Sequence, residues 1–382
     1  MDRYIYYIWL NFIEMSTDKK VRLIEYFGSA RRVFEASEDE LLEAKLLSDR
    51  QIKLLLDKNL KKAEKEYKKA EKYGVEFVCL EDDIYPKNLM NIYDPPILLY
   101  TKGNKNLLKK ELCFCIVGTR YATPYGLDEG MKIASALAEC GMVIVSGLAI
   151  GGDSATHQGA LKVKGDTIGV AACGINREYP AGNGNLRRKI AENGLIISEF
   201  PFDYPVRAKN FHIRNRILSG LSLGTAVIEA PKGSGTLITA NHAKEQNRDV
   251  FALPGNITSR MSKGANELIN DGATVILGAE TILAEYLVRY PHLFEIDEYI
   301  EEYKKKNEEI DEIEISEIKE ELENAEKDDK KIIKKLLKSG DKNFEEIISE
   351  TGMETSKLNV LLTTMQIEGI IYEKMGRIFS LK

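Results

Sequence analysis

The sequence predicts an α/β protein with a doubly wound parallel sheet, preceded by a helical domain and followed by a winged-helix-like domain. Three observations carry this prediction. Short apolar runs alternate with helical segments from Cys113 to about Tyr290. The first 72 residues show helical periodicity only, and the residues after 328 combine helical segments with a terminal hairpin. Parallel strands have continuous apolar runs because helices cover both faces of their sheet.

Residues 1–72 are predicted to form a helical domain of the SAM or helix-hairpin-helix type. Apolar residues such as Ile5 and Ile8 recur at helical spacing, and Ser48 can cap a later helix. The segment 53–73 is predicted to be an amphipathic helix. Its lysine-rich face fits a solvated surface better than a nucleic-acid contact.

Residues 73–290 are predicted to form the central domain. Ahead of its core, the short strands 75–80 and 97–100 are expected to extend one edge of the sheet. Core strands are expected near 114–117, 142–146, 167–172, 195–198, 224–229, 249–253 and 273–276. The intervening helices are expected near 126–140, 153–163, 184–193, 211–220, 236–247 and 263–271. This alternation is typical of a doubly wound sheet.

The acidic charge is concentrated near the predicted linker, 291–328. Residues 295–329 hold 17 Asp/Glu and 5 Lys, a net charge of −12. Residues 113–290 hold 18 Lys/Arg against 16 Asp/Glu (+2), and residues 330–382 hold 10 against 7 (+3). The total of −6 therefore leaves room for a nucleic-acid site on the central domain. The winged-helix-like domain, 329–382, fits DNA contact and protein docking equally well.

The cysteines and apolar segments indicate a cytoplasmic protein without a metal site. The five Cys form no CxxC pair, so buried reduced thiols are expected. No run is long enough to span a bilayer, and the apolar start, Tyr4–Ile13, lacks the cleavage site of a signal peptide. We expect no membrane contact.

Three segments place polar residues beyond predicted strands, at the edge where doubly wound sheets bind their ligands. In the first, Gly118, Thr119 and Arg120 follow one strand, and Ser146 and Gly147 follow the next. Backbone amides at a helix start, with an arginine beside them, form an anion site. Neither GxGxxG nor the Walker spacing GxxxxGKS/T is present, so no ATP, NAD or other cofactor is expected.

The second segment is the loop 231–236, between a strand and a helix. Gly233 and Gly235 permit close backbone approach, and Ser234 and Thr236 add hydroxyl donors. Because a helix begins there, the loop favours a phosphate or a sugar. Taken alone, it is equally consistent with an ordinary turn capped by threonine.

The third segment, 207–216, interleaves cations with an aromatic residue. Its candidate contact residues are Lys209, Phe211, Arg214, Asn215 and Arg216. A single-strand site requires cations for phosphates and a ring for base stacking. The alternative is a surface helix in which Arg214 or Arg216 pairs with an acidic neighbour.

Catalysis finds little support. Asp153 and His157 share a helix face, and Glu199 ends a strand, but no nucleophile–base pair is evident. We expect His157 to be structural and the protein to bind a ligand rather than to be an enzyme.

Together these segments resemble the DNA-processing protein A family, also called DprA or Smf. The resemblance rests on YPKNLMNIYDPPILLYTKG, IVGTRYATPYG, VIVSGLAIGGDSATHQGAL, NFHIRNRILSGLS, APKGSGTLITA, VFALPG and GANELINDGA, in chain order. It implies an extended Rossmann-like domain that binds single-stranded DNA without ATP and forms a homodimer. It further implies that the protein protects incoming strands and loads the RecA recombinase in natural transformation and recombination.

The resemblance also assigns site residues. Arg120 corresponds to the family's pocket arginine. Lys209 and the run Arg214-Asn215-Arg216 correspond to its basic stretch, and Gly233–Thr236 to its glycine-serine loop. The departures from the family pattern are at Gly152, His212 and the Gly-Ser-Gly that follows Lys232. None removes a charged pocket residue, so DNA binding is expected to survive.

The alternative is an enzyme of related fold, similar to the nucleoside-monophosphate phosphoribohydrolases with their PGGxGTxxE loop. Here Thr239 stands where that class has the glutamate that assists glycosidic cleavage. A RecA-docking scaffold without nucleic-acid affinity would leave the basic rim unexplained. Release of a free base from a nucleotide would distinguish the enzyme from a binding protein.

Overall fold

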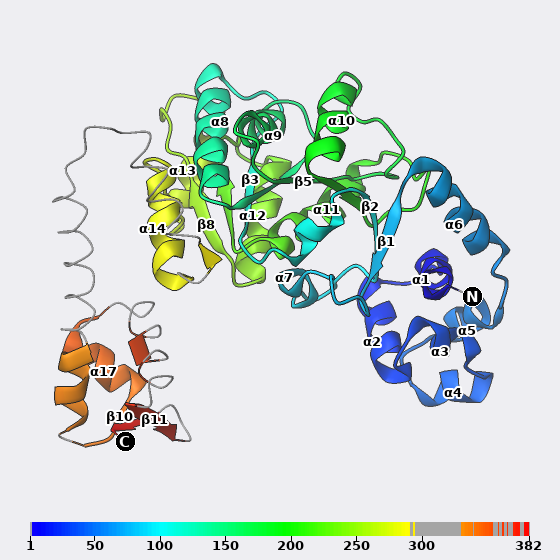
Figure 1. Ribbon diagram of the computed structural model, residues 1–382, viewed down its shortest axis with the longest axis horizontal. Coiled ribbons are helices and arrows are strands. Elements are labelled where there is room, and N and C mark those ends of the chain that lie inside the picture. Colours follow the sequence, from blue (N-terminus) through cyan, green and yellow to red (C-terminus); the bar gives the residue numbers. More distant parts are fainter. Residues whose placement is uncertain are drawn as a thin grey trace. The chain divides into compact units, whose positions relative to one another are not determined.

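The computed structural model describes residues 2–290 and, in the C-terminal part, residues 293–294, 330–338, 340–353, 358, 361–362, 365, 370–374 and 378–381. The chain divides into two compact units, Met1–Ile282 and Leu283–Lys382. The first unit contains the N-terminal helices and the large sheet (Figure 1).

The chain begins with six short helices, as the periodicity predicts. They are α1 (Arg3–Phe12), α2 (Thr17–Phe27), α3 (Ala30–Glu35), α4 (Glu38–Glu43), α5 (Asp49–Leu56) and α6 (Lys61–Tyr73). Ser48 is the N-cap of α5, and its amide donates to Gln51 Oε1 at 3.1 Å. Gly28 (φ 86°) and Gly74 (φ 61°) end α2 and α6 in the left-handed conformation that glycine tolerates best. Local capping therefore sets these helix boundaries.

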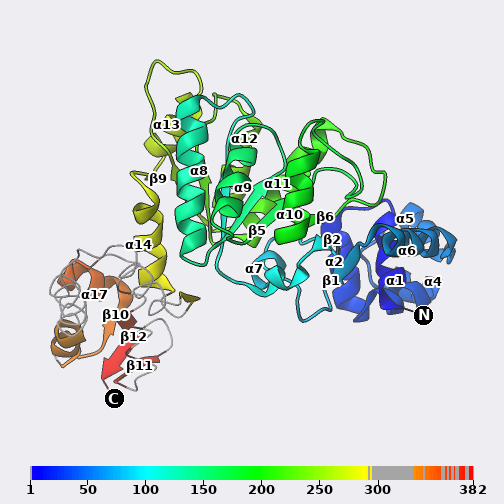
Figure 2. The same ribbon diagram turned by 45° about the horizontal axis from the view of Figure 1, so that its top comes forward.

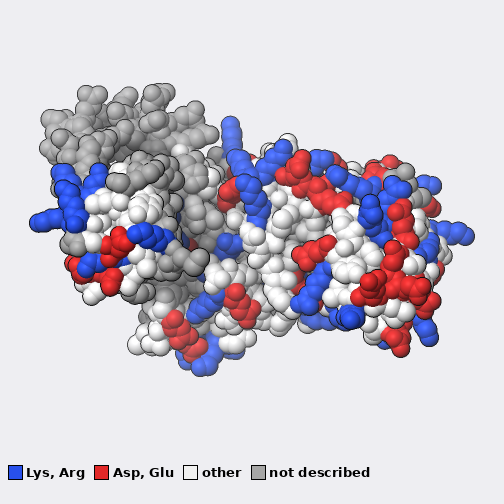
Figure 3. Space-filling model, turned by 90° about the horizontal axis from the view of Figure 1, so that it is seen from below, with Lys and Arg blue, Asp and Glu red and all other residues white. Residues whose placement is uncertain are grey.

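The lysine-rich face of α6 is largely exposed, as expected. Lys69 forms an ion pair with Asp203, and Lys62 lies 4.0 Å from the ring centroid of Phe12. Over the N-terminal helices seen in Figure 3, basic and acidic side chains are interspersed rather than gathered by sign. This fits a solvated surface.

A nine-stranded sheet forms the centre of the first unit, in the order β1-β2-β6-β5-β4-β3-β7-β8-β9. The strands are β1 (Glu76–Cys79), β2 (Leu98–Gly103), β3 (Cys113–Val117), β4 (Val143–Gly147), β5 (Thr167–Val170), β6 (Leu195–Ser198), β7 (Gly224–Val227), β8 (Asp249–Ala252) and β9 (Thr274–Val275). The pairs from β6 to β9 are parallel, and β1 and β2 extend the edge antiparallel. The predicted core strands and the predicted edge extension are confirmed.

Helices cover both faces of this sheet (Figures 1 and 2). The helices of this part of the chain are α7 (Lys87–Met90), the 3-10 helix Lys105–Lys109, α8 (Pro124–Glu139), α9 (Gly152–Lys162), α10 (Gly184–Asn193), α11 (Ala208–Leu221), α12 (Gly235–Glu245) and α13 (Lys263–Asn270). Helix α14 (Ala279–Arg289) spans the boundary between the two units. Helices α8, α9 and α10 lie on one face, and α11 and α12 on the other. The chain moves outward from β3 to β6 and then returns to place β7 beside β3. The strand order reverses between β3 and β7, where doubly wound sheets open their ligand crevice.

Cys79, Cys113, Cys115 and Cys173 are buried free thiols, as the sequence indicates. Burial raises the pKa of the Cys113 and Cys115 thiols to about 12. These thiols stay protonated and serve as small apolar core residues.

The C-terminal unit has a three-stranded antiparallel sheet, in the order β10 (Lys342–Asn343), β12 (Ile378–Leu381) and β11 (Ile371–Lys374). Asn343 caps α17 (Phe344–Thr351) in a capping box with Glu346. Buried side chains from this helix and from β11 and β12 share one apolar core. The predicted helix after Ser356 lies mostly outside the described residues, as does the acidic segment 295–329, so the winged helix stays a prediction. In the part of the chain that is described, none of the helices has the length and apolarity needed to cross a membrane.

Arg216 of α11 is a buried member of an ion-pair network. Its Nε lies 2.9 Å from Asp94 Oδ2, and its Nη2 lies 2.6 Å from Glu199 Oε2. Burial lowers the pKa of Lys20 in α2 to about 8, and the nearby Glu199 carboxylate partly opposes this shift. Asn11 Nδ2 of α1 donates to the Glu199 carbonyl at 3.3 Å, so this region connects α11, the end of β6 and the N-terminal helices.

His157 of α9 is also buried, with both ring nitrogens in hydrogen bonds. Nε2 lies 2.8 Å from the Gly147 carbonyl oxygen, and Nδ1 lies 2.7 Å from Thr167 Oγ1. The carbonyl can only accept, so Nε2 carries the proton of the neutral ring. Nδ1 lies beside Thr167 Oγ1, whose hydroxyl donates to the Ile144 carbonyl at 2.8 Å. Burial lowers the pKa of His157 to about 4. His157 is thus structural, as expected.

We predict that Arg216→Met lowers the free energy of unfolding by about 3–5 kcal/mol, because it leaves buried Glu199 without its partner. Lys209→Ala, at an exposed position of the same helix, should change stability by less than about 0.5 kcal/mol. Urea denaturation of both variants measures this. Equal stabilities would contradict the structural role of Arg216.

We also predict that acid destabilises the protein through His157. The unfolded histidine binds a proton below pH ~6.5, whereas the folded one does so only near pH 4. Its contribution is therefore complete above pH ~6.5 and decreases by about 3 kcal/mol as the pH falls to ~4. Denaturation of the wild type and His157→Gln across this range measures the difference. An identical pH slope for both would contradict the prediction.

Candidate functional site

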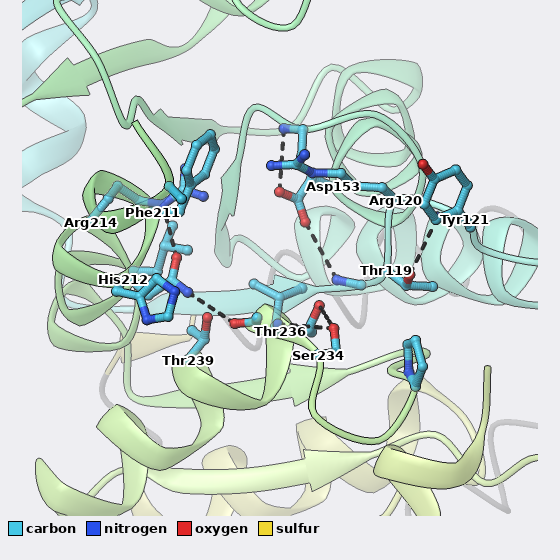
Figure 4. A pocket seen from close by; sticks show the side chains of 18 of the residues that line it. Thr119, Arg120, Tyr121, Asp153, Phe211, His212, Arg214, Ser234, Thr236 and Thr239 are labelled. Atoms are coloured by element: carbon cyan, nitrogen blue, oxygen red, sulfur yellow. Dashed lines mark hydrogen bonds between the residues drawn. The ribbon is translucent and has the colours of Figure 1, made fainter. Parts of the chain in front are cut away.

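A pocket of about 650 Å³ opens at the carboxyl ends of the strands where their order reverses. Its lining residues come from the segments that follow β3, β4, β5 and β8, from the start of α11 and from the loop before α12. Figure 4 shows part of this lining. Crevices at such reversals are the usual ligand sites of doubly wound sheets. The pocket is therefore the candidate functional site.

The loop after β3 is held closely against the start of α9. Thr119 N donates to the Glu229 carbonyl at 2.8 Å, and Gly152 N donates to the Thr119 carbonyl at 3.1 Å. A Cβ on Gly152 would lie 2.6 Å from the Gly118 Cα. A side chain at position 152 would therefore force this loop to shift.

A buried carboxylate occupies the N-terminus of α8. Thr123 donates to Glu229 twice, from its amide to Oε2 at 2.7 Å and from its hydroxyl to Oε1 at 2.9 Å. The sequence suggests that this helix start faces an external anion, and the structure differs because Glu229 already takes that position. Arg120, which is exposed at the pocket wall, supplies the cation of this loop.

Asp153 and Arg214 form the floor of the pocket. The Asp153 carboxylate accepts from Gly118 N and Ala149 N, each at 3.4 Å. Burial raises the pKa of Asp153, and the charge of Arg214 opposes that shift. Arg214 Nη1 donates to the Val170 carbonyl, and its Nε donates to Asn215 Oδ1 at 3.1 Å. Both charged groups are thus held by main-chain groups at or just beyond the carboxyl ends of β3, β4 and β5.

Phe211 lies against the cations of the pocket. The Arg120 guanidinium lies 5.0 Å from its ring centroid, and that of Arg214 lies 5.9 Å away. Tyr179 meets the same ring edge-on, with centroids 5.8 Å apart. A ligand base can extend this stack or displace Arg120 from it.

The loop before α12 presents a second helix N-terminus. Ser234 caps α12 by accepting from Thr236 N at 3.2 Å, and Gly233 takes a φ of 72°. No acidic residue occupies the first turn of α12, in contrast to the carboxylate at α8. Asn215 Nδ2 donates to the Gly235 carbonyl at 3.2 Å, which ties α11 to α12. This N-terminus is available to an anion.

Most of the predicted contact residues line the pocket. They are Gly118, Thr119, Arg120, Phe211, Arg214, Asn215, Gly233, Ser234, Gly235 and Thr236. Lys209 is exposed on α11 but is not in the wall, and Arg216 belongs to the buried ion pairs, the alternative that its sequence position left open. Ser146 is buried, with its hydroxyl donating to the Ile116 carbonyl at 2.6 Å, and the Gly147 carbonyl binds His157. Ser146 and Gly147 therefore do not line the pocket.

The pocket contains further residues that sequence reasoning did not single out as contacts. They are Tyr121, Tyr179, Arg207, His212, Lys232, Thr239 and Arg260, together with Asp153. Arg207 and His212 belong to the basic segment and could have been named. Tyr179 and Arg260 come from loops without a motif, so only the folded chain brings them here.

The pocket wall is strongly cationic. It contains Arg120, Arg207, Arg214, Lys232 and Arg260. Asp153 is the one acidic residue among the described lining residues. This balance favours a polyanionic ligand.

Nothing in the described pocket resembles hydrolytic machinery. Asp153 is already engaged by two amides and lies near Arg214, and Thr239 holds the position where the phosphoribohydrolase loop has its glutamate. Within the described residues, no group of three His, Cys, Asp or Glu side chains is arranged to hold a metal. The enzyme alternative is not favoured.

Comparison with known proteins places this architecture in a family. Residues 76–287 match the family model described as DNA recombination-mediator protein A. The chain is 41% identical over 212 residues to DNA processing protein DprA of Bacillus subtilis (strain 168), covering 56% of this chain and 71% of that protein.

Two solved structures of DNA processing protein A are also similar. That from Streptococcus pneumoniae superimposes with a TM-score of 0.66 at 32% identity, covering 75% of this chain and 98% of the other. That from Helicobacter pylori, described for its single-stranded DNA binding mode, has a TM-score of 0.51 at 34% identity and covers 56% and 96%. Because the family match extends over more than half of the chain, this protein belongs to the DNA recombination-mediator protein A family, and the resemblance seen in its sequence is confirmed.

Proposed function

We propose that this protein binds single-stranded DNA in the pocket between β3 and β7 and mediates recombination by loading a RecA-type recombinase on the bound strand. The observation that carries the proposal is the convergence of arginines around Phe211 where the strand order reverses. The Helicobacter pylori relative, whose structure concerns single-stranded DNA binding, supports it.

Phosphate contacts would supply most of the affinity. Arg120, Arg207 and Arg260 are exposed pocket residues that come from three separate loops. The N-terminus of α12 adds backbone donors and a favourable dipole. Lys209 is exposed on the first turn of α11 and is proposed to meet the strand at the pocket entrance. Binding should weaken steeply with salt because counterions are released.

Base stacking would restrict binding to single strands. Phe211 and Tyr179 form an aromatic edge that a splayed base can reach, whereas a base inside a duplex has no free face. Each stacked base contributes about 1–3 kcal/mol with little sequence preference. Ser146, Gly147 and Arg216 are proposed to support the pocket from below rather than to contact DNA.

The other domains extend this proposal. We infer a helical domain at 1–72, a DNA-binding domain at 73–290, an acidic linker at 291–328 and a winged-helix-like domain at 329–382. Homodimerisation through the central domain, and protection of incoming DNA in transformation, follow from the family resemblance. The C-terminal domain is assigned to DNA contact or to protein docking, and its deletion would separate the two.

The test is fluorescence anisotropy of a labelled oligo-dT titrated without ATP at two salt concentrations. Wild type should bind tightly and prefer single strands to duplex. Arg120→Ala should weaken binding by about tenfold or more, and Lys209→Ala should lower the salt slope by about one. Arg188→Ala, an exposed arginine on α10 outside the pocket, is the matched control and should bind normally.

Three results of the anisotropy experiment would contradict parts of this proposal. Absence of wild-type binding would overturn the proposal, and release of free base from nucleotides would then be assayed. Normal binding by both Arg120→Ala and Lys209→Ala would move the site away from the pocket. Equal affinity for duplex would remove the role of base stacking.

A further inference from the structure

The pocket is elongated along the carboxyl edge of the sheet. Its lining residues come from loops that follow successive strands in sheet order. Tyr179 follows β5, Asp153 follows β4, Arg120 and Tyr121 follow β3, Ser234 follows β7, and Arg260 follows β8. Four strand spacings separate β5 from β8 in this order, which is about 19 Å at ~4.8 Å per spacing. Each strand of duplex DNA advances ~3.4 Å per nucleotide. By that measure the pocket, called the trough below, is long enough for several nucleotides.

The two ends of this trough differ in whether their aromatic ring is exposed. At the β5 end, Phe211 is already covered by Arg120 and Tyr179. On the other side of Arg120, Tyr121 lies in the wall with 77% of its surface exposed (Figure 4). A free aromatic face in a cationic trough is a site for stacking a base.

Arg260 supplies a cation at the β8 end. Its guanidinium is exposed, and within the described residues it has no acidic partner, whereas the neighbouring Lys232 pairs with Glu267 at 2.8 Å. The loop that carries Arg260 is attached to α8, because the Tyr125 hydroxyl donates to the Pro254 carbonyl at 2.9 Å. This bond ties the loop that carries Arg260 to the first turn of α8, and Tyr121 lies three residues before that helix.

We propose that Tyr121 and Arg260 form a second nucleotide subsite, in which Tyr121 stacks on a base and Arg260 binds a phosphate. The bound strand then crosses the carboxyl edge of the sheet from α11 to the loop after β8, rather than occupying only the Phe211 end. This inference rests on the proposed binding of single-stranded DNA and specifies its path.

Tyr121→Trp tests the stacking directly. The chain has one tryptophan, Trp9, which is 4% exposed in the N-terminal helical core, so the new residue would dominate the response of the emission to DNA. Oligo-dT should quench this emission, with saturation at the concentration that saturates anisotropy. Tyr93→Trp is the matched control, since Tyr93 is 78% exposed and lies outside the pocket. Its emission should not change.

Affinity and oligonucleotide length provide the second test. Tyr121→Ala should weaken binding of a long oligo-dT about tenfold. Tyr121→Phe, which keeps the aromatic ring, should bind with the affinity of the wild type. Arg260→Ala should lower the salt slope by about one. Both defects should diminish for oligonucleotides too short to reach past Arg120, because such ligands occupy only the Phe211 end.

The outcomes separate this inference from the proposed function. If the wild type binds DNA and Arg120→Ala does not, but Tyr121→Trp is not quenched and Tyr121→Ala and Arg260→Ala bind normally, the second subsite is overturned and the pocket proposal stands. If the wild type fails to bind, the proposed function is overturned and this inference falls with it.

Discussion

The pocket depends on the position of Glu229 at the end of β7. Its main-chain carbonyl accepts from Thr119, and its buried carboxylate accepts from the amide and the hydroxyl of Thr123. One residue therefore fixes both the loop that carries Arg120 and the first turn of α8. Because the carboxylate satisfies that helix terminus internally, an external anion must be met by arginine side chains and by the free N-terminus of α12.

Arg214 and Arg216 show how one short motif serves two purposes. Two positions apart on a helix, their side chains diverge by about 200°. Arg214 points to the pocket floor, between Asp153 and the Val170 carbonyl, whereas Arg216 points to Glu199 and Asp94. The same run thus shapes the ligand site and stabilises the junction with the N-terminal helices. Loss of Arg214 would change the pocket, whereas loss of Arg216 would break the buried ion pairs.

The chemistry of the pocket explains why binding is favoured over hydrolysis. A carboxylate that acts on a glycosidic bond must be free to accept or donate a proton at the ligand. Asp153 is held by two backbone amides with Arg214 nearby, and the position of a catalytic glutamate is taken by Thr239. The remaining groups are cations and aromatic rings, the side chains that suit a polyanion with exposed bases.

The sequence by itself determined the elements of the fold. Apolar runs such as Cys113–Val117 predict buried strands, Ser48 predicts a helix start, and the glycines of the loop 231–236 predict a close backbone turn. These signals suffice because periodicity, capping and glycine conformations act over a few neighbouring residues.

Tertiary structure alone decided which of these elements meet. Ser146 and Gly147 end a strand as predicted, yet they face the core and α9 rather than a ligand. Tyr179 and Arg260 belong to loops without a signature, and they enter the pocket because the strand order places β5 and β8 on either side of β3 and β7. Sheet order results from long-range packing of whole helices and strands, and no local pattern of residues encodes it.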